Sequence, residues 1–166
     1  AEGGVRLHTE LLLRQIISEG LKLTLCVNKI DRLILELRLH PNDAYYKMRH
    51  VVEEVNEMIK RLDPAGRYET LCPSRGNVCF GSGQHGYCVT LGDFAQLYAD
   101  VYHDLGMSVE EFRRRLWGEW FFDQSERRFR RKGRGKRTFV EFVLEPIYKL
   151  YVQCLGETEK DVSKTL

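Results

Sequence analysis

The chain has 166 residues, of which 43% are hydrophobic and 30% charged, and its formal net charge at pH 7 is +2. This length suits one globular domain with a sizeable core, or a piece of a larger protein, and the composition is that of a soluble protein. No stretch approaches the roughly 20 apolar residues that a membrane span needs, and no signal peptide is visible at Ala1.

The first two predicted elements are a helix and a buried strand. Thr9 can cap a helix that stops at Gly20, a residue type that commonly ends helices. Residues 21–27 follow as an almost continuous apolar run, which is typical of a strand covered on both faces in a parallel α/β sheet. Ligands of such sheets bind outside the carboxyl ends of the strands, so the residues after Val27 are candidates for a site.

Those residues are Asn28, Lys29 and Asp31, in the pattern Asn-Lys-x-Asp. The pattern resembles the guanine-specificity motif of P-loop GTPases, in which Asp31 would accept hydrogen bonds from the ring N–H and the exocyclic amine of guanine. Adenine lacks this pair of donors and would leave the carboxylate unpaired, at a cost of roughly 1–3 kcal/mol. Lys29 would lay its aliphatic stem along the base, and Asn28 would tether neighbouring loops. The alternative is a capped strand-to-helix turn, which Asn and Asp favour in any case.

A short helical turn over 32–39 and a long helix beginning at Pro41 follow this loop. Apolar residues recur in the long helix at steps of three and four, which predicts a buried stripe of Tyr45, Met48, Val52, Val55, Ile59 and Leu62. Residues 63–66, Asp-Pro-Ala-Gly, formally match the Asp-x-x-Gly of a GTPase metal loop. They follow a helix, however, and their Pro and Gly suit a type I turn, so we interpret them as a turn.

A second short strand over 77–80 leads into the glycine-flanked loop Gly81-Ser82-Gly83-Gln84. The helix between the two strands makes residues 21–84 a strand, helix, strand unit, so the strands should be parallel with a right-handed crossover. Both polar loops then leave the sheet at the same edge. The backbone around Ser82 and Gly83 could approach a purine closely, whereas the alternative is a plain Gly-rich turn.

The remaining elements are predicted from caps, turns and a basic segment. Helices should begin near Asp93 and Ser108, and a hairpin should form around residues 123–126. Residues 127–137 hold eight of the 26 Lys and Arg residues and no acid, so the positive charge is concentrated there. A closing helix over 138–155, with an apolar side that includes Phe139, Val143, Ile147, Leu150 and Cys154, should kink or restart at Pro146.

The cysteines and histidines do not predict a metal site. The five cysteines are odd in number, contain no Cys-x-x-Cys pair and mostly have apolar neighbours, which predicts reduced, buried thiols of an intracellular protein. The five histidines are scattered too widely for metal-ligand spacing. We therefore expect no metal site built by this chain alone.

Four stretches carry a family resemblance: residues 28–56, 76–100, 115–122 and 137–151. Through them, nearly the whole chain resembles the elongation factor 2 group of translational GTPases. The string Asp-Ala-Tyr-Tyr-Lys-Met-Arg-His at 43–50 is more similar to the spliceosomal branch, found in the U5 small nuclear ribonucleoprotein, than to true elongation factor 2.

The resemblance implies an α/β fold, the C-terminal half of a P-loop GTPase G domain with three αβα layers and parallel strands, plus a small inserted α+β subdomain. Residues 1–86 would be the second half of the G domain, 87–137 the inserted subdomain with its basic hairpin, and 138–166 the closing helix and a linker. The guanine of GTP or GDP would be bound by Asn28, Lys29, Asp31, Ser82, Gly83 and Gln84. The last two residues depart from the usual Ser-Ala-Lys of the second guanine loop.

No Gly-x-x-x-x-Gly-Lys-[Ser/Thr] phosphate loop occurs in the sequence. By the resemblance, that loop, the switch threonine, the metal loop and the water-positioning histidine would precede Ala1, and the missing half would hold Mg²⁺. His85 follows the guanine loop and is no substitute. Because the chain also lacks an initiator Met, we expect a fragment without catalytic residues, for which GTP hydrolysis alone is not supported.

The resemblance implies a nuclear GTP-binding switch protein of pre-mRNA splicing, with spliceosomal proteins and the U5 RNA particle as partners. Two alternatives stay open: a ribosomal translocase of the elongation factor 2 type, which would be cytoplasmic, and a non-enzymatic protein or RNA interaction module. The basic segment could contact RNA phosphates, serve as a nuclear targeting signal, or be a solvated loop. Its basic residues are Arg127, Arg128, Arg130, Arg131, Lys132, Arg134, Lys136 and Arg137.

Overall fold

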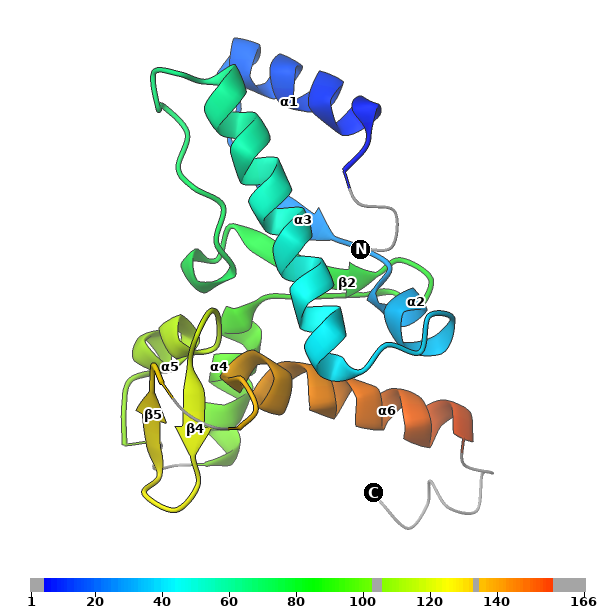
Figure 1. Ribbon diagram of the computed structural model, residues 1–166, viewed down its shortest axis with the longest axis vertical. Coiled ribbons are helices and arrows are strands. Elements are labelled where there is room, and N and C mark those ends of the chain that lie inside the picture. Colours follow the sequence, from blue (N-terminus) through cyan, green and yellow to red (C-terminus); the bar gives the residue numbers. More distant parts are fainter. Residues whose placement is uncertain (1–4, 103–105, 133–134, 157–166) are drawn as a thin grey trace.

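The computed structural model describes residues 5–102, 106–132 and 135–156 (Figure 1). A sheet in the order β1-β2-β3 (Leu25–Val27, Val78–Ser82 and Tyr87–Val89) has the long helix α3 (Pro41–Leu62) running across one face. A separate hairpin is formed by β4 (Phe121–Asp123) and β5 (Arg128–Arg130). This mixture of helices and strands agrees with the predicted α/β class. Among the described helices, none combines the length and apolar character that crossing a membrane requires.

Helix α1 (Leu7–Glu19) begins earlier than the sequence predicted. Arg6 occupies the N-cap position and its side chain makes no capping hydrogen bond, so the predicted cap at Thr9 is wrong. Thr9 lies inside the first turn, where its backbone N–H donates to the Arg6 carbonyl at 2.8 Å. The predicted stop at Gly20 is confirmed, because Gly20 adopts the left-handed conformation with φ +66°.

Strand β1 is shorter and more exposed than predicted. It covers residues 25–27 rather than 21–27, and Leu21 is 54% exposed. Val27 is buried but Cys26 is exposed, because alternate side chains of a strand point to opposite faces and only one face is covered here. The predicted burial on both faces is therefore wrong for the described part of the chain.

Strands β1 and β2 pair in parallel, as the strand, helix, strand pattern predicted, with Cys26 opposite Cys79 and Val27 opposite Phe80. Strand β2 runs on to Ser82, further than predicted, and returns as β3 in an antiparallel pairing with Ser82 opposite Tyr87. The third strand was not predicted, because a three-residue strand after a Gly-rich loop carries little periodic signal.

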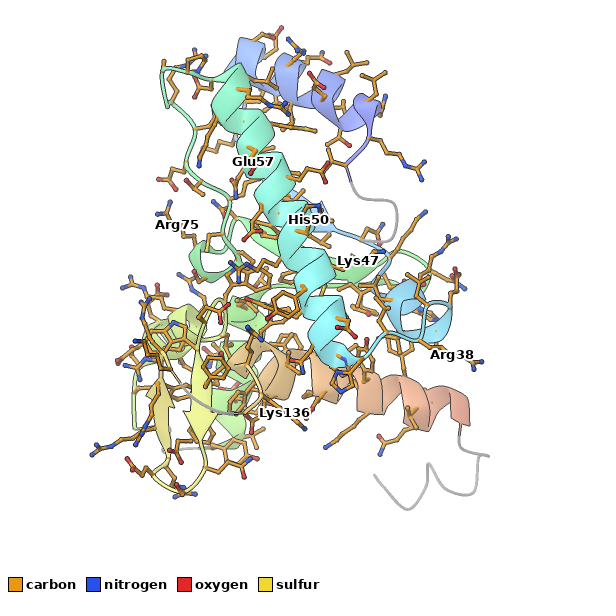
Figure 2. All side chains as sticks on the ribbon, in the orientation of Figure 1. Arg38, Lys47, His50, Glu57, Arg75 and Lys136 are labelled. Atoms are coloured by element: carbon orange, nitrogen blue, oxygen red, sulfur yellow. The ribbon has the colours of Figure 1, made fainter. Side chains whose placement is uncertain are left out.

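Helix α2 (Ile30–Leu35) is short, and α3 begins at Pro41 as predicted. The predicted stripe on α3 is buried, apart from the half-buried Leu62. The opposite face carries exposed polar residues such as His50 and Glu57 (Figure 2). The predicted turn after α3 is confirmed, because the Gly66 N–H donates to the Asp63 carbonyl at 3.0 Å.

Beyond a short 3₁₀ turn, Pro73–Arg75, the chain forms α4 (Leu91–Val101) and α5 (Val109–Arg115). The side chain of Ser108 caps α5 as predicted, accepting from the Glu111 N–H at 3.2 Å. Helix α4 is capped by Thr90 rather than by Asp93. Asp93 is the third helical residue, and its carboxylate accepts from the Thr90 N–H at 2.7 Å, completing a reciprocal capping box.

The closing helix restarts near Pro146, as predicted. A π-helical turn over Val140–Leu144 precedes α6 (Glu145–Gly156), and Pro146 has no N–H to donate to the preceding turn. The predicted apolar side is buried at Phe139, Val143 and Ile147. It is exposed at Leu150 and Cys154, whereas Tyr151 between them is buried and packs into the core.

All five cysteines are free thiols, but their predicted burial is wrong. Cys26, Cys88 and Cys154 are exposed, and Cys72 and Cys79 are half-buried. The apolar neighbours that suggested burial alternate with the cysteines along β1 and β2, so they occupy the opposite, covered face.

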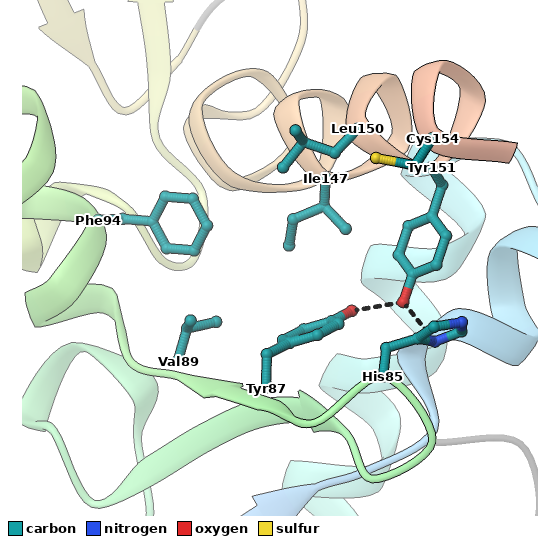
Figure 3. A pocket seen from close by; sticks show the side chains of 8 residues that line it. All are labelled: His85, Tyr87, Val89, Phe94, Ile147, Leu150, Tyr151 and Cys154. Atoms are coloured by element: carbon teal, nitrogen blue, oxygen red, sulfur yellow. Dashed lines mark hydrogen bonds between the residues drawn. The ribbon is translucent and has the colours of Figure 1, made fainter. Parts of the chain in front are cut away.

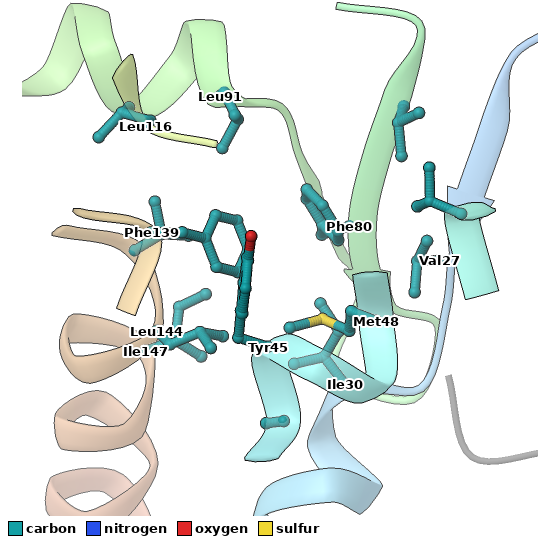
Figure 4. Packing of buried hydrophobic residues seen from close by; sticks show 14 of the residues in the cluster. Val27, Ile30, Tyr45, Met48, Phe80, Leu91, Leu116, Phe139, Leu144 and Ile147 are labelled. Carbon is teal, nitrogen blue, oxygen red and sulfur yellow. The ribbon is translucent and has the colours of Figure 1, made fainter. Parts of the chain in front are cut away.

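An aromatic cluster joins the sheet to α3 and to the closing helix (Figure 4). The ring of Phe139 lies 5.3 Å from Phe80 of β2, 5.5 Å from Tyr45 of α3 and 4.8 Å from Trp117, measured between centroids. Rings at these distances and inclinations attract one another beyond the area they bury. The cluster therefore fixes the part of β2 that immediately precedes the second polar loop.

Asn56 of α3 supplies hydrogen bonds that Leu71 would otherwise lack. Its amide donates to the Leu71 carbonyl and accepts from the Leu71 N–H, both at 2.8 Å. We expect Asn56→Ala to lower the free energy of unfolding by roughly 2–3 kcal/mol, because both groups lose their partners beneath the surface. Urea unfolding followed by circular dichroism measures this. Asn42→Ala, at the start of the same helix, is the control, and an equal loss in both variants would contradict the assignment.

Candidate functional site

The two polar loops meet at the carboxyl ends of β1 and β2. The side-chain oxygen of Asn28 accepts from the backbone N–H of Gly83 at 2.9 Å and from that of Lys29 at 2.7 Å. A Cβ atom at Gly83 would lie 3.4 Å from the Asn28 amide nitrogen, which is an ordinary contact distance. Asn28 therefore ties the first loop to the second.

Lys29 is exposed and stands in the left-handed conformation, φ +64° and ψ +43°, at the N-cap of α2. Non-glycine residues adopt this conformation at an energetic cost and do so most often at functional turns. The turn lets the chain pass from β1 directly into α2, and it places Asp31 in the first turn of that helix.

Asp31 is 4% exposed, and its Oδ1 atom has no hydrogen-bond partner among the described residues. A buried acceptor left unpaired costs roughly 1–3 kcal/mol, and more when it is charged. Such an atom at the edge of a loop pair matches a ligand that brings its own N–H donors.

Ser82 is fully buried, and its hydroxyl is engaged within the protein. Its oxygen accepts from the His85 N–H at 3.2 Å and lies 3.1 Å from His85 Nδ1. The exposed residues of the second loop are Gly83 and Gln84. Of the six residues singled out from the sequence, Asn28 and Gly83 are joined directly, and Ser82 supports the second loop from below rather than presenting its side chain.

Three residues beneath the second loop were not predicted as part of the site. The Tyr151 hydroxyl of α6 is hydrogen-bonded to His85 Nδ1 at 3.1 Å and donates to the Tyr87 hydroxyl at 3.1 Å (Figure 3). Burial, and then the bond with Tyr151, raise the pKa of Tyr87 well above its usual range, so this phenol stays protonated. No sequence signal links Tyr151 to a loop far earlier in the chain.

Next to this network lies an apolar cavity of about 430 Å³ (Figure 3). Its walls come from Tyr87 and Val89 of β3, Phe94 of α4, and Ile147 and Leu150 of α6. Aliphatic and aromatic walls of this kind do not supply the donors and acceptors that a purine requires. The cavity therefore does not have the lining expected of a purine site.

Residues 1–151 match the elongation factor Tu GTP binding domain family. The chain belongs to this family. The match confirms the resemblance to translational GTPases, and guanine nucleotide binding is the property for which the family is named.

Curated relatives confirm the spliceosomal branch of the resemblance. The chain is 44% identical over 170 residues to the "110 kDa U5 small nuclear ribonucleoprotein component CLO" of Arabidopsis thaliana, covering 100% of this chain and 17% of that protein. It is 43% identical over 166 residues to "Pre-mRNA-splicing factor cwf10" of Schizosaccharomyces pombe, covering 98% of this chain and 17% of that protein. The chain therefore spans about a sixth of the length of these relatives.

Proposed function

We propose that this chain is the guanine-recognising part of a GTP-binding switch protein that acts in pre-mRNA splicing. The observation that carries the proposal is the unpaired Oδ1 of buried Asp31, next to two loops that Asn28 ties together. The family supports the nucleotide, and the names of the relatives, a U5 ribonucleoprotein component and a pre-mRNA-splicing factor, support the process. They favour splicing over ribosomal translocation, and a nuclear over a cytoplasmic location.

In this proposal each loop residue has a separate role. Asp31 accepts from the ring N–H and the exocyclic amine of guanine, and the exposed stem of Lys29 lies along the base. The backbone N–H of Gln84 faces the guanine carbonyl oxygen, since the N–H of Gly83 already donates to Asn28. Ser82, with its hydroxyl bound to His85, holds that loop in place.

For the fold, we propose the second half of a three-layer G domain with an inserted subdomain. Residues 1–86 and 138–166 would belong to the G domain and 87–137 to the insertion. The parallel pairing of β1 with β2, and the helix α3 on one face of the sheet, support the layered arrangement. The joint packing of α4, α5 and the hairpin through Tyr98, Phe112 and Phe129 supports a compact insertion.

The residues of this chain recognise the base and do not include a loop that binds the phosphates. Its sequence contains no phosphate-loop motif, so Mg²⁺ and the phosphates of GTP would be held by residues outside the two polar loops. Asp63 cannot stand in as a metal ligand, because its carboxylate accepts from the Tyr68 N–H at 2.9 Å and from Arg67 at 3.0 Å.

For RNA, we propose contact through only part of the basic segment. Arg130 pairs with Glu126, Lys136 with Glu145 and Arg137 with Glu119. Among the described residues, no acidic partner neutralises the exposed Arg127, Arg128, Arg131 and Lys132. Arg134 lies outside the described residues. The hairpin end is therefore the part of the basic segment whose positive charges are not paired with acidic side chains and can bind phosphates.

Titration of the full-length protein with fluorescent GTP tests the nucleotide proposal. We expect a dissociation constant well below 1 mM, which corresponds to about −4.1 kcal/mol. ATP should compete roughly 10- to 100-fold less well, because adenine lacks the donors that Asp31 needs. Equal competition by ATP would overturn base recognition, and no binding at all would favour a pure interaction module.

The RNA that co-purifies with the full-length protein tests the proposed process. Small nuclear RNA would indicate splicing, and ribosomal RNA would indicate translocation.

The tie between the loops makes a second, smaller prediction. We expect Asn28→Ala to weaken GTP binding by about tenfold, because the N–H groups of Gly83 and Lys29 lose their common acceptor and the two loops can separate. Isothermal titration of the variant measures this effect. Asn77→Ala is the control, since Asn77 makes equivalent hydrogen bonds to Cys72 and Thr70 at the opposite end of β2. A similar loss in both variants would mean that general loosening, not the tie, is responsible.

A further inference from the structure

Three cysteines from three neighbouring strands gather on the face of the sheet away from α3. Cys26 of β1 and Cys79 of β2 are direct partners in the parallel register, and Cys88 of β3 lies opposite Gly81, two residues beyond Cys79. Their three sulfur atoms all lie within 4.8 Å of one another. The sequence spacing does not show this group, because the strand register and not a short motif brings it together.

The alternation of the strands explains the arrangement. Val27, Val78 and Phe80 are buried on the covered face, and the cysteines take the intervening positions on the other face. Gly81 leaves the space that the group occupies. A Cβ atom there would lie 3.5 Å from the Cβ of Cys88 and 2.6 Å from the Tyr87 carbonyl oxygen. Any side chain at residue 81 would therefore press against the backbone and side chain of strand β3 at Cys88.

The spacing is close to that of a metal thiolate site. Zinc–sulfur bonds of about 2.3 Å place sulfur ligands of one ion roughly 4 Å apart, so a small rotation of the side chains would suffice. All three donors are sulfur, and neither His nor carboxylate belongs to the group. Such a set selects soft, thiophilic ions over Mg²⁺ or Ca²⁺. Two of the three thiols, Cys26 and Cys88, are exposed in this chain.

We propose that Cys26, Cys79 and Cys88 bind one thiophilic metal ion, with Zn²⁺ as the probe, on the outer face of the sheet. Each thiol gives its proton to the solvent as its metal–sulfur bond forms, and a fourth ligand, water or a partner group, completes the coordination. The ion joins all three strands. It thereby stabilises the strand pair β1–β2 from which both polar loops emerge.

Protection from alkylation tests the site in the unaltered protein. Full-length protein, reduced and freed of metal, is treated with iodoacetamide with or without one equivalent of Zn²⁺, and the modified cysteines are identified by mass spectrometry. We expect Zn²⁺ to protect Cys26 and Cys88, whereas Cys154, exposed on α6, reacts equally in both samples. Equal labelling of Cys26 and Cys88 with and without Zn²⁺ would overturn the proposal.

Affinity measurements on variants give the second test. We expect calorimetry to show one Zn²⁺ per chain at this site, and Cys79→Ser to weaken binding by more than the roughly 10- to 100-fold that follows loss of an outer-shell partner. Cys154→Ser is the matched control and should bind as the unaltered protein does. Unchanged affinity in Cys79→Ser would refute the site. A second contradicting result would be a disulfide that forms within the group in air, together with reduced thiols that fail to bind Zn²⁺.

Discussion

Replacing Asp31 by Asn is expected to shift the preference of the full-length protein from GTP toward xanthosine triphosphate. The introduced amide would present an N–H₂ donor where the carboxylate accepted, and this donor opposes the exocyclic amine of guanine. Xanthine carries a carbonyl oxygen at that place and pairs with the new donor. We expect GTP affinity to fall roughly 10- to 100-fold, corresponding to the cost of about 1–3 kcal/mol for an unpaired buried group. Competition titrations with the two nucleotides measure the shift.

Asp43→Asn is the matched control for this experiment. Asp43 lies in the first turn of α3, as Asp31 lies in the first turn of α2, but it is exposed and belongs to neither polar loop. The control should keep the original preference. An Asp31→Asn protein that still preferred GTP would show that the buried carboxylate does not read the base.

The second large effect concerns stability. We expect Phe80→Ala to lower the free energy of unfolding by about 3–5 kcal/mol, because the ring is 1% exposed and its removal leaves a cavity between Tyr45, Trp117 and Phe139. Chemical unfolding of the full-length protein, followed by tryptophan fluorescence, reports this directly, since Trp117 lies 5.7 Å from the Phe80 ring. The affinity for GTP should fall together with the stability, because β2 leads into the second polar loop.

Leu97→Ala removes an apolar side chain of similar kind from the surface of α4, where Leu97 is 56% exposed. Its effect should stay within about 0.5 kcal/mol. If Phe80→Ala proved equally mild, the aromatic cluster would not be the element that secures β2, and the link between the core and the loops would need another explanation.

Local patterns predicted much of the secondary structure. The helix from Pro41, the hairpin around 123–126 and the restart at Pro146 each follow from residues within one or two turns of one another. The extent of β1 and the burial of its cysteines were mispredicted, since these depend on what covers each face of the sheet. An apolar run has the same sequence pattern whether one face or both faces of the sheet are covered.

The candidate site divides in the same way. Asn28, Lys29 and Asp31 were proposed because a short motif carries their chemistry, and the parallel register brought Gly83 to Asn28 as expected. The support under the loop, from Tyr151 and Tyr87 through His85, joins residues that are far apart in sequence. Such long-range partners depend on tertiary packing that no periodicity encodes.

The hydrogen bonds of Tyr151 have one further consequence. They attach α6 to the loop that carries Gly83 and Gln84, so the position of this helix and the geometry of that loop share a free energy. Such coupling is reciprocal: if the loop binds the nucleotide as proposed, a partner that displaces α6 would change nucleotide affinity by the same factor by which the nucleotide changes the affinity for that partner. The closing helix would then be the route by which an assembly reads whether the polar loops are occupied.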